Sequence, residues 1–230
     1  MNQPHQVYIS LGSNQGDRFK NLQDAIDHVH LKIGTVKIIS KVYNSPAFGF
    51  DPEASGDDFY NVCMHVETYL NPKKVMQELL SIEKSLGRVR NDQKKYEART
   101  IDLDILLIDN DIIDTKTLKV PHPEMHKRRF VLRPLNNIAP NIEHPKLKKT
   151  ASVLLEECED NSELEGINIW LKNPSKVFNF SKHNYIAIEG NIGAGKTSLA
   201  KIIAQDFNAK LVLERFADNA FLPKFYKEPK

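Results

Sequence analysis

Two aspartates separated by one residue, Asp102 and Asp104, begin an apolar run that ends at Ile108. The alternation of polar and apolar residues predicts a strand, and its period of two places both carboxylates on one face, opposite Leu103 and Ile105. Two adjacent carboxylates repel each other unless a cation sits between them. Magnesium prefers oxygen ligands and is often held by one or two carboxylates plus substrate phosphates. The pair therefore predicts a magnesium site, and the alternative is a solvated acidic strand face.

Basic residues flank this strand on both sides. The upstream set is Lys84, Arg88, Arg90, Lys94, Lys95 and Arg99, and the downstream set is His122, His126, Lys127, Arg128, Arg129 and Arg133. Guanidinium groups bind phosphate oxygens in pairs, so an acidic pair between two basic segments predicts a magnesium-nucleotide site. The alternative is a set of solvated surface charges, since the formal net charge is only +2. The segregation of charge along the chain argues against that alternative.

Five short motifs follow one another along the chain. They are Leu-Gly-Ser-Asn at 11–14, Phe-Tyr-Asn-Val at 59–62, Gly-Arg-Val-Arg at 87–90, Ala-Arg-Thr-Ile-Asp-Leu-Asp at 98–104 and Val-Pro-His-Pro at 120–123. In this order they resemble the 6-hydroxymethyl-7,8-dihydropterin pyrophosphokinases of folate biosynthesis, over about residues 5–160. The resemblance implies an α+β, ferredoxin-like fold and an ATP-dependent diphosphotransferase that releases AMP. Glu97 departs from the family's usual glycine or alanine, which we expect to alter loop geometry without removing the chemistry.

The resemblance also implies a role for individual residues. Asp102 and Asp104 would hold two magnesium ions that bridge the phosphates of ATP. The implied catalytic set is Arg88, Arg99, Asp102 and Asp104; the implied ATP-binding set is Arg88, Arg90, Arg99, His122 and Arg128; and the implied pterin-binding set is Ser45, Pro46, Phe48, Asn61 and Phe130. From the residues alone, core packing is the simpler explanation for Phe130. For His122, a rigid loop position between two prolines favours a functional role.

A second motif follows much later in the chain. Residues 185–189 predict a short buried strand, and residues 190–197 match the phosphate-loop pattern G-x-x-x-x-G-K-[ST] ahead of a helical apolar spacing. The phosphate-binding residues of this pattern are Gly190, Gly193, Gly195, Lys196 and Thr197. The glycines let backbone amides face phosphate, Lys196 reaches the terminal phosphates and Thr197 ligates magnesium.

Residues 183–228 resemble the beginning of the deoxynucleoside kinases, with a further strand from Leu211. In those enzymes a glutamate at the position of Glu214 accepts the proton of the sugar 5′-hydroxyl, whereas a surface acid at a strand end is the open alternative. Only 33 residues (230 minus 197) follow Thr197, fewer than a multi-stranded parallel sheet needs. We therefore expect an amino-terminal piece of such a kinase, with deoxynucleoside kinase activity as the alternative function of a longer fused chain.

The expected organisation is a pyrophosphokinase domain at 1–160, a linker at 161–182 and a truncated P-loop segment at 183–230. The linker is rich in polar residues, with a short strand at about 167–171 packing back on the first domain. In that domain we expect strands at 7–11, 36–42, 59–68 and from Asp102. One helix should lie between the first two strands, and another should begin at Pro72 and end near Gly87. Long loops are expected at 44–58 and 88–98.

The composition, 40% hydrophobic and 27% charged, is normal for a globular enzyme. The beginning of the chain lacks the features of a signal peptide, and no apolar run reaches membrane-spanning length. Cys63 and Cys158 have no metal-ligand spacing, so we expect reduced thiols and a cytoplasmic location. The expected partners are ATP and the hydroxymethyl pterin, with no membrane. RNA binding is disfavoured because acidic residues occupy the strand where stacking aromatics would be needed.

Overall fold

The computed structural model describes residues 3–46, 58–88, 98–168, 170–176, 186–191, 194–206 and 210–213. The chain divides into two compact units, residues 1–177 and 178–230. Four predicted site residues, Phe48, Arg90, Gly193 and Glu214, lie outside the described residues, as does Glu97. Within the described part of the chain, no helix is both long and apolar enough to cross a membrane.

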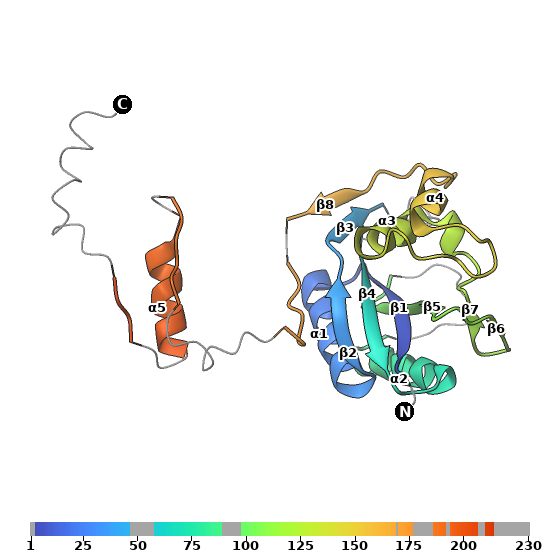
Figure 1. Cartoon of the computed structure of the whole chain (residues 1–230), viewed down its shortest axis with the longest axis horizontal. Helices are drawn as coiled ribbons and strands as arrows, with labels where there is room; N and C mark the ends of the chain where they lie inside the picture. The colour runs from blue at the N-terminus through green and yellow to red at the C-terminus, as the bar shows by residue number, and fades with distance from the viewer. Residues whose placement is uncertain are drawn as a thin grey trace. The chain divides into compact units, whose positions relative to one another are not determined.

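The first unit is built on one antiparallel sheet (Figure 1). Its strands are β1 (His5–Ser13), β2 (Thr35–Ile39), β3 (Val42–Ser45), β4 (Phe59–Thr68), β5 (Asp102–Ile108) and β8 (Glu165–Ile167). The strand order is β5-β1-β4-β3-β8, and β2 also pairs with β4. A separate hairpin joins β6 (Ile113–Asp114) to β7 (Lys119–Val120). The central strands β1 and β4 are therefore paired on both sides.

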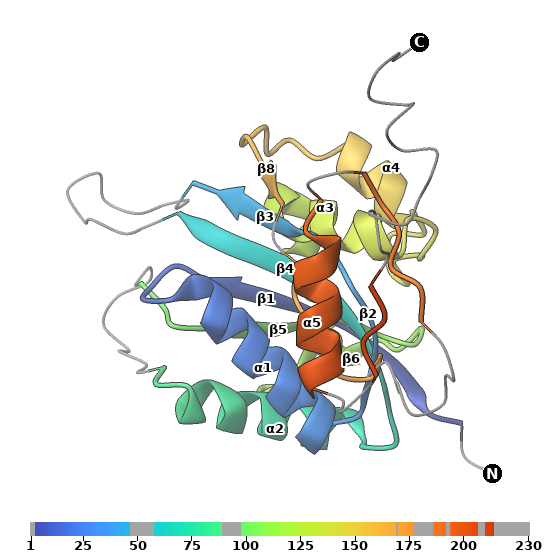
Figure 2. The ribbon, with the colours of Figure 1, turned by 90° about the vertical axis from the view of Figure 1, so that its left-hand side faces the viewer.

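Helices cover both faces of this sheet, on opposite sides of the strands (Figure 2). The helices α1 (Arg18–Lys32) and α2 (Pro72–Ser85) pack on the face that carries Val7, Ile9 and Leu11. The other face carries Cys63 and packs against α3 (Arg129–Ile138), which contacts α4 (Ala151–Glu156). Each apolar face is thus buried by helices, which produces a mixed α+β architecture with a hydrophobic core on each face of the sheet.

The helix ends agree with the capping signals in the sequence. Asn71 accepts a hydrogen bond from the backbone N–H of Lys74 at 2.9 Å, and Pro72 takes the first helical position of α2. Gly87 follows that helix with a φ of 84°, a left-handed conformation that glycine adopts without strain. At the first helix, Asp17 accepts from the N–H of Lys20 at 3.0 Å.

The single strand predicted at 36–42 is wrong, because the chain breaks it into β2 and β3 at Ser40. The Ser40 hydroxyl donates to the Lys41 carbonyl at 2.8 Å and accepts from the backbone N–H of Cys63 at 3.0 Å. A serine side chain that bonds the nearby backbone competes with the regular ladder. The alternation of Val36, Ile38, Ser40 and Val42 gave no warning of this local interruption.

The segment predicted as a linker contributes a strand to the first unit. Strand β8 pairs with β3, with Ile167 opposite Val42 and Glu165 opposite Asn44. Farther along, the Lys172 backbone exchanges two hydrogen bonds with the side-chain amide of Gln23, at 2.7 and 3.1 Å. The chain is therefore held against the first unit well beyond residue 160.

The described part of the second unit contains one helix, α5 (Lys196–Asp206). The strands predicted at 185–189 and from Leu211 are wrong for the residues described, since 186–190 and 211–213 carry no strand. None of the apolar side chains there is buried, and Val212 is 74% accessible. Apolar alternation produces a strand only when a neighbouring strand supplies the hydrogen bonds, and the described residues of this unit provide none.

Candidate active site

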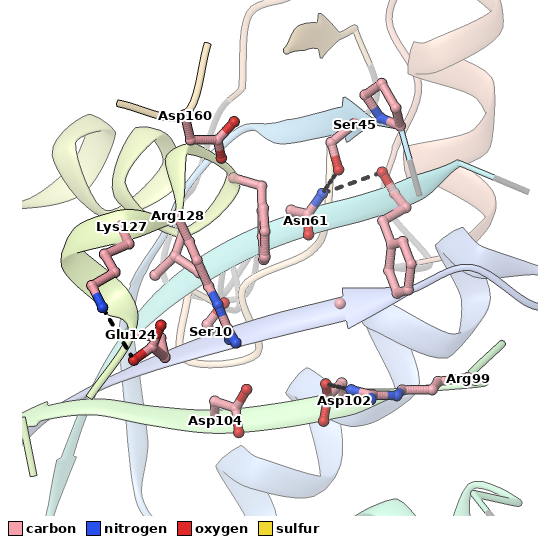
Figure 3. A pocket seen from close by; sticks show the side chains of 15 residues that line it. Ser10, Ser45, Asn61, Arg99, Asp102, Asp104, Glu124, Lys127, Arg128 and Asp160 are labelled. Atoms are coloured by element: carbon pink, nitrogen blue, oxygen red, sulfur yellow. Dashed lines mark hydrogen bonds and ion pairs between the residues drawn. The ribbon is translucent and has the colours of Figure 1, made fainter. Parts of the chain in front are cut away.

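A cavity of about 290 Å³ opens on the sheet face that α3 partly covers (Figure 3). Its floor is formed by Ser10 and Gly12 of β1, Asn61 of β4, and Asp102 and Asp104 of β5. Antiparallel pairing sets these residues side by side, because Gly12 lies opposite both Asp102 and Asn61. One wall is the end of β3, and the other is the turn leading into α3.

The two aspartates lie as predicted, on one face of β5, while Leu103 and Ile105 are buried in the core on the other. Asp102 forms ion pairs with two arginines, one carboxylate oxygen accepting from Arg88 and the other from Arg99. The side chains of Arg88 and Asp102 are 12% and 20% exposed. These ion pairs are therefore only partly screened by water.

Asp104 has no such partner. Among the described residues, no hydrogen bond or ion pair reaches its carboxylate. Burial, reinforced by the negative charges of Asp102 and Glu83, raises the pKa of Asp104 to about 7. A largely buried carboxylate beside a second carboxylate, with oxygen ligands only, suits a divalent cation such as magnesium. The residues present therefore fit a magnesium site at Asp102 and Asp104.

A buried glutamate of α2 supports this arrangement from behind. Glu83 accepts the backbone N–H of Leu103 at 2.8 Å and forms an ion pair with Arg88. Leu103 is the residue between the two aspartates, so this bond fixes the strand where the carboxylates emerge. Glu83 was not singled out in the sequence, because its position five residues before Arg88 has no distinguishing pattern.

The Leu-Gly-Ser-Asn motif has a structural role at the same edge of the site. The Ser13 hydroxyl donates to the Thr100 carbonyl at 2.6 Å, and the Asn14 side-chain oxygen accepts from the backbone N–H of Arg99 at 2.6 Å. The backbone N–H of Asn14 also donates to the Arg99 carbonyl at 3.1 Å. These bonds hold the segment that leads into β5, and with it the Arg99 side chain beside Asp102.

Asn61 is buried and points into the opposite part of the cavity. Its side-chain N–H groups donate to the Ser45 hydroxyl at 2.9 Å and to the Phe59 carbonyl at 3.3 Å. Its carbonyl oxygen has no partner among the described residues and is free to accept. Phe59 and Phe130 both line the cavity. Phe59 was missed as a site residue, although it begins the Phe-Tyr-Asn-Val motif.

Beside Phe130, the charged side chains at the α3 end of the cavity are Glu124, Lys127, Arg128 and Asp160. The Arg128 guanidinium lies 5.9 Å from the centroid of the Phe130 ring. Glu124 and Lys127 form an ion pair of 3.7 Å (Figure 3). Neither Glu124 nor Lys127 was predicted as a site residue. Their position within the downstream basic segment is the sequence feature that could have indicated them.

His122 lies next to this segment but is not among the residues lining the cavity. Burial, together with the positive charge of Arg128, lowers the pKa of His122 to about 4. Its Nδ1 accepts from the backbone N–H of Glu124 at 3.2 Å. The neutral ring therefore carries its proton on Nε2, where it is available to a ligand as a hydrogen-bond donor.

The structure thus brings most of the predicted residues together. Those that line this cavity are Ser45, Pro46, Asn61, Arg99, Asp102, Asp104, Arg128 and Phe130. Arg88 is joined to them through Asp102. Carboxylates, guanidinium groups, an amide and two aromatic rings therefore surround one space.

A family model described as 7,8-dihydro-6-hydroxymethylpterin-pyrophosphokinase matches residues 8–140. The pyrophosphokinase of Aquifex aeolicus is 39% identical over 143 residues, which cover 62% of this chain and 86% of that protein. The Bacillus subtilis pyrophosphokinase is 36% identical, with 76% of this chain and 95% of that protein covered. The chain belongs to this family.

Larger proteins also contain this pyrophosphokinase region. The chain is 37% identical to the folic acid synthesis protein fol1 of Pneumocystis carinii, but it spans only 23% of that protein. A crystal structure of Plasmodium falciparum HPPK-DHPS, with pteroate, superposes with a TM-score of 0.54 at 16% identity, covering 68% of this chain and 42% of that one. At that identity the superposition shows the pyrophosphokinase fold and nothing more.

The second unit carries the phosphate-loop pattern outside the pyrophosphokinase region. A family model described as deoxynucleoside kinase matches residues 186–230. The helix α5 begins at Lys196, as the pattern predicts. The Lys196 ammonium donates to the carbonyls of Gly190 and Asn191, both at 2.6 Å. The lysine therefore folds over the beginning of its own loop.

Proposed function

We propose that this protein transfers pyrophosphate from ATP to 6-hydroxymethyl-7,8-dihydropterin, giving the pterin diphosphate and AMP. Membership of the family and the names of its relatives support this reaction. The observation that carries it is the convergence of Asp102 and Asp104 with Asn61 and Phe130 around one cavity. The succession β1, α1, the broken strand β2 and β3, β4, α2 and β5 follows a β-α-β-β-α-β pattern, and from it we infer a ferredoxin-like core.

The pterin end of the cavity is assigned to Asn61 and the two aromatic side chains. A pterin presents alternating donors and acceptors on one edge and a flat apolar face. The free side-chain oxygen of Asn61 matches a donor on that edge, while Phe59 and Phe130 offer surfaces for the ring. Ser45 orients Asn61 through the bond of 2.9 Å, so it acts on the pterin through that amide.

The phosphate end is assigned to the acidic pair and the basic residues around it. Asp102 and Asp104 would hold two magnesium ions, which supply charge neutralisation on the phosphate oxygens when bound. Arg99 and Arg128 line the cavity and would contact phosphate oxygens directly, with Arg88 beside Asp102. His122 would donate from Nε2 as a neutral ring, adding a hydrogen bond without a further charge.

The reaction is a displacement at the β-phosphorus of ATP. The hydroxymethyl oxygen of the pterin forms a bond to that phosphorus, and the bond from phosphorus to the α,β-bridging oxygen breaks, so AMP leaves. Such a transfer depends on positioning and electrostatic stabilisation more than on covalent participation by the protein. The site accordingly offers charged and aromatic groups, and we assign no residue the role of nucleophile.

The decisive experiment measures AMP formation from ATP with and without the hydroxymethyl pterin. ATP labelled at the β-phosphate should transfer its label to the pterin product, with one AMP released for each pterin consumed. Label recovered in inorganic phosphate or ADP, or AMP formation independent of the pterin, would overturn the assignment.

We also propose that residues 190–197 bind phosphate as part of a deoxynucleoside kinase segment, the alternative function for a fused chain. The match at residues 186–230 and the position of Lys196 at the start of α5 favour it. Glu214 would then be the base for the sugar hydroxyl. The test is deoxynucleoside-dependent formation of ADP by a longer fused chain, measured separately from the AMP that the first unit releases; residues 1–230 alone should form none.

A further inference from the structure

Helix α3, which carries Phe130, begins without a cap from its own neighbouring residue. The first backbone N–H groups of a helix have no partner inside it, and a side chain just before the helix usually accepts one of them. Here that position belongs to Arg128, whose side chain makes no capping hydrogen bond. Instead Asp160, 31 residues farther along the chain, accepts the backbone N–H of Arg129 at 2.8 Å.

Asp160 is itself firmly held. Its second carboxylate oxygen accepts from the backbone N–H of Ser162 at 3.0 Å and from the Ser162 hydroxyl. Burial alone would raise the pKa of Asp160, but the hydrogen bonds from Ser162 and Arg129 lower it. The carboxylate is therefore ionised at neutral pH, and both of its oxygens are occupied by donors.

The segment around Asp160 connects the two walls of the cavity. We call residues 158–167 the strap. Near one end, Asp160 binds the start of α3 and also lines the cavity (Figure 3). At the other end, β8 pairs with β3, whose last residue, Ser45, orients Asn61. The aromatic wall and the amide wall are thus tied together by ten residues of chain.

We propose that Asp160 is a positioning residue for the pterin, which fixes Phe130 against the cavity by capping α3. This inference rests on the proposed function, because it takes the cavity as the pterin site. Phe130 lies in the first turn of the helix, next to the residue whose N–H the carboxylate accepts. Arg128 depends less on this cap, since its backbone N–H bonds to Met125 in the preceding turn. Loss of Asp160 should therefore weaken pterin binding more than ATP binding.

The test compares three variants of the full chain. In Asp160→Ala, the dissociation constant and KM for the pterin should rise about fivefold, which is the loss expected for one helix cap. The KM for ATP should change by less than half as much. Asp160→Asn should bind the pterin nearly as well as the parent protein, because asparagine caps helices as effectively as aspartate. Glu159→Ala is the matched control, since Glu159 is an exposed acid next to Asp160 on the strap.

Equal losses for ATP and pterin, or an Asp160→Ala variant indistinguishable from Glu159→Ala, would overturn the inference. If Asp160→Ala does not fold, Ser162→Ala provides the second test, because it removes one donor that orients the carboxylate and should shift pterin affinity in the same direction. Asn61→Ala separates this inference from the assignment of the cavity. If Asn61→Ala leaves pterin binding intact, the pterin site is wrong; if only the strap variants are without effect, the strap inference alone fails.

Discussion

The acidic pair on β5 contains two chemically different carboxylates. Asp102 is neutralised by Arg88 and Arg99, whereas Asp104 is buried without a partner among the described residues. Under the proposed function, a cation would therefore compensate Asp104 most, and Arg88 and Arg99 beside Asp102 would be available to a phosphate group. This difference leads to distinct expectations for each residue.

Asp102→Asn and Asp104→Asn should each nearly abolish pterin-dependent AMP formation while the fold remains intact. Each change removes one of two carboxylates that would hold magnesium. Turnover at saturating magnesium and circular dichroism provide the measurements. Asp114→Asn, at an exposed position, is the control and should retain full activity. Normal turnover in either site variant would contradict the metal assignment.

The two arginines should differ in their effect on stability. Arg99→Ala should slow turnover about a hundredfold, the usual loss for one charge-stabilising donor, with little change in Tm because its side chain is 29% exposed. Arg88→Ala should lower both turnover and Tm, since it removes the ion pairs that one largely buried guanidinium makes with Glu83 and with Asp102. Thermal unfolding and steady-state kinetics on both variants distinguish the two roles. Equal Tm values for the two variants would show that Arg88 has no structural part.

His122 should make stability depend on pH. Because the pKa of His122 falls from its ordinary 6.5 to about 4, the unfolded chain binds a proton more readily than the native state between those values. Stability is lost as the pH falls from 6.5 towards 4, by at most about 3 kcal/mol from this group. His122→Asn should therefore lose less unfolding free energy between pH 7 and pH 4.5, measured by denaturant titration. Equal losses of unfolding free energy in the variant and the parent protein would show that the His122 ring is exposed to water and not buried.

At the scale of the elements, antiparallel register creates the site. Pairing of β1 with β4 and β5 places Gly12 between Asn61 and Asp102, which are 41 residues apart in the chain. The helices behind the sheet then hold this register through tight contacts, such as the bond from Leu103 to Glu83. The connection between α1 and β2 packs even more closely against strand β4, and a substitution there would test the packing of the sheet.

Gly34 lies where any side chain would collide with strand β4. A Cβ at this position would approach the Glu67 carbonyl oxygen to 2.2 Å and the Thr68 Cβ to 2.9 Å. Gly34→Ala should therefore cost roughly 1–3 kcal/mol of unfolding free energy through overpacking. Gly166→Ala is the control, because the nearest atom to its Cβ lies at an ordinary 3.9 Å. A Gly34→Ala variant as stable as the control would contradict the close approach of these elements.

At the scale of the whole molecule, the chain divides into two units. All the residues that line the cavity lie within residues 1–177, and the phosphate-loop pattern lies within residues 178–230. Helix α5 is the only regular element that the described residues of the second unit form. The residues to which we assign a role in the pyrophosphokinase reaction therefore all lie in the first unit.

Lys196→Ala should accordingly leave pterin-dependent AMP formation unchanged within twofold. The physical reason is that the described residues that line the cavity belong to the first unit, whereas the described hydrogen-bond partners of Lys196 are Gly190 and Asn191 of its own loop. Lys196→Arg is a useful companion, because it keeps the positive charge while altering the shape of the donor. A marked loss of AMP formation in Lys196→Ala but not in Lys196→Arg would mean that the two units share a catalytic function.

The sequence by itself determined the local features of this protein. Period-two alternation placed Asp102 and Asp104 on one face of a strand, and Asn71 and Pro72 marked the start of a helix, because both signals depend only on nearby backbone geometry. The ordered motifs also identified the family. Such features are fixed over a few residues and need no knowledge of what packs against them.

Only the tertiary structure decided which distant groups meet. The cap that Asp160 provides to α3, the bond from Glu83 to the strand between the aspartates, and the place of Phe59 beside the cavity all join segments far apart in the chain. The same dependence explains the errors. Ser40 divides a predicted strand by bonding its neighbours, and the apolar residues from Ile186 form no strand among the described residues, because a strand exists only where another strand completes its hydrogen bonds.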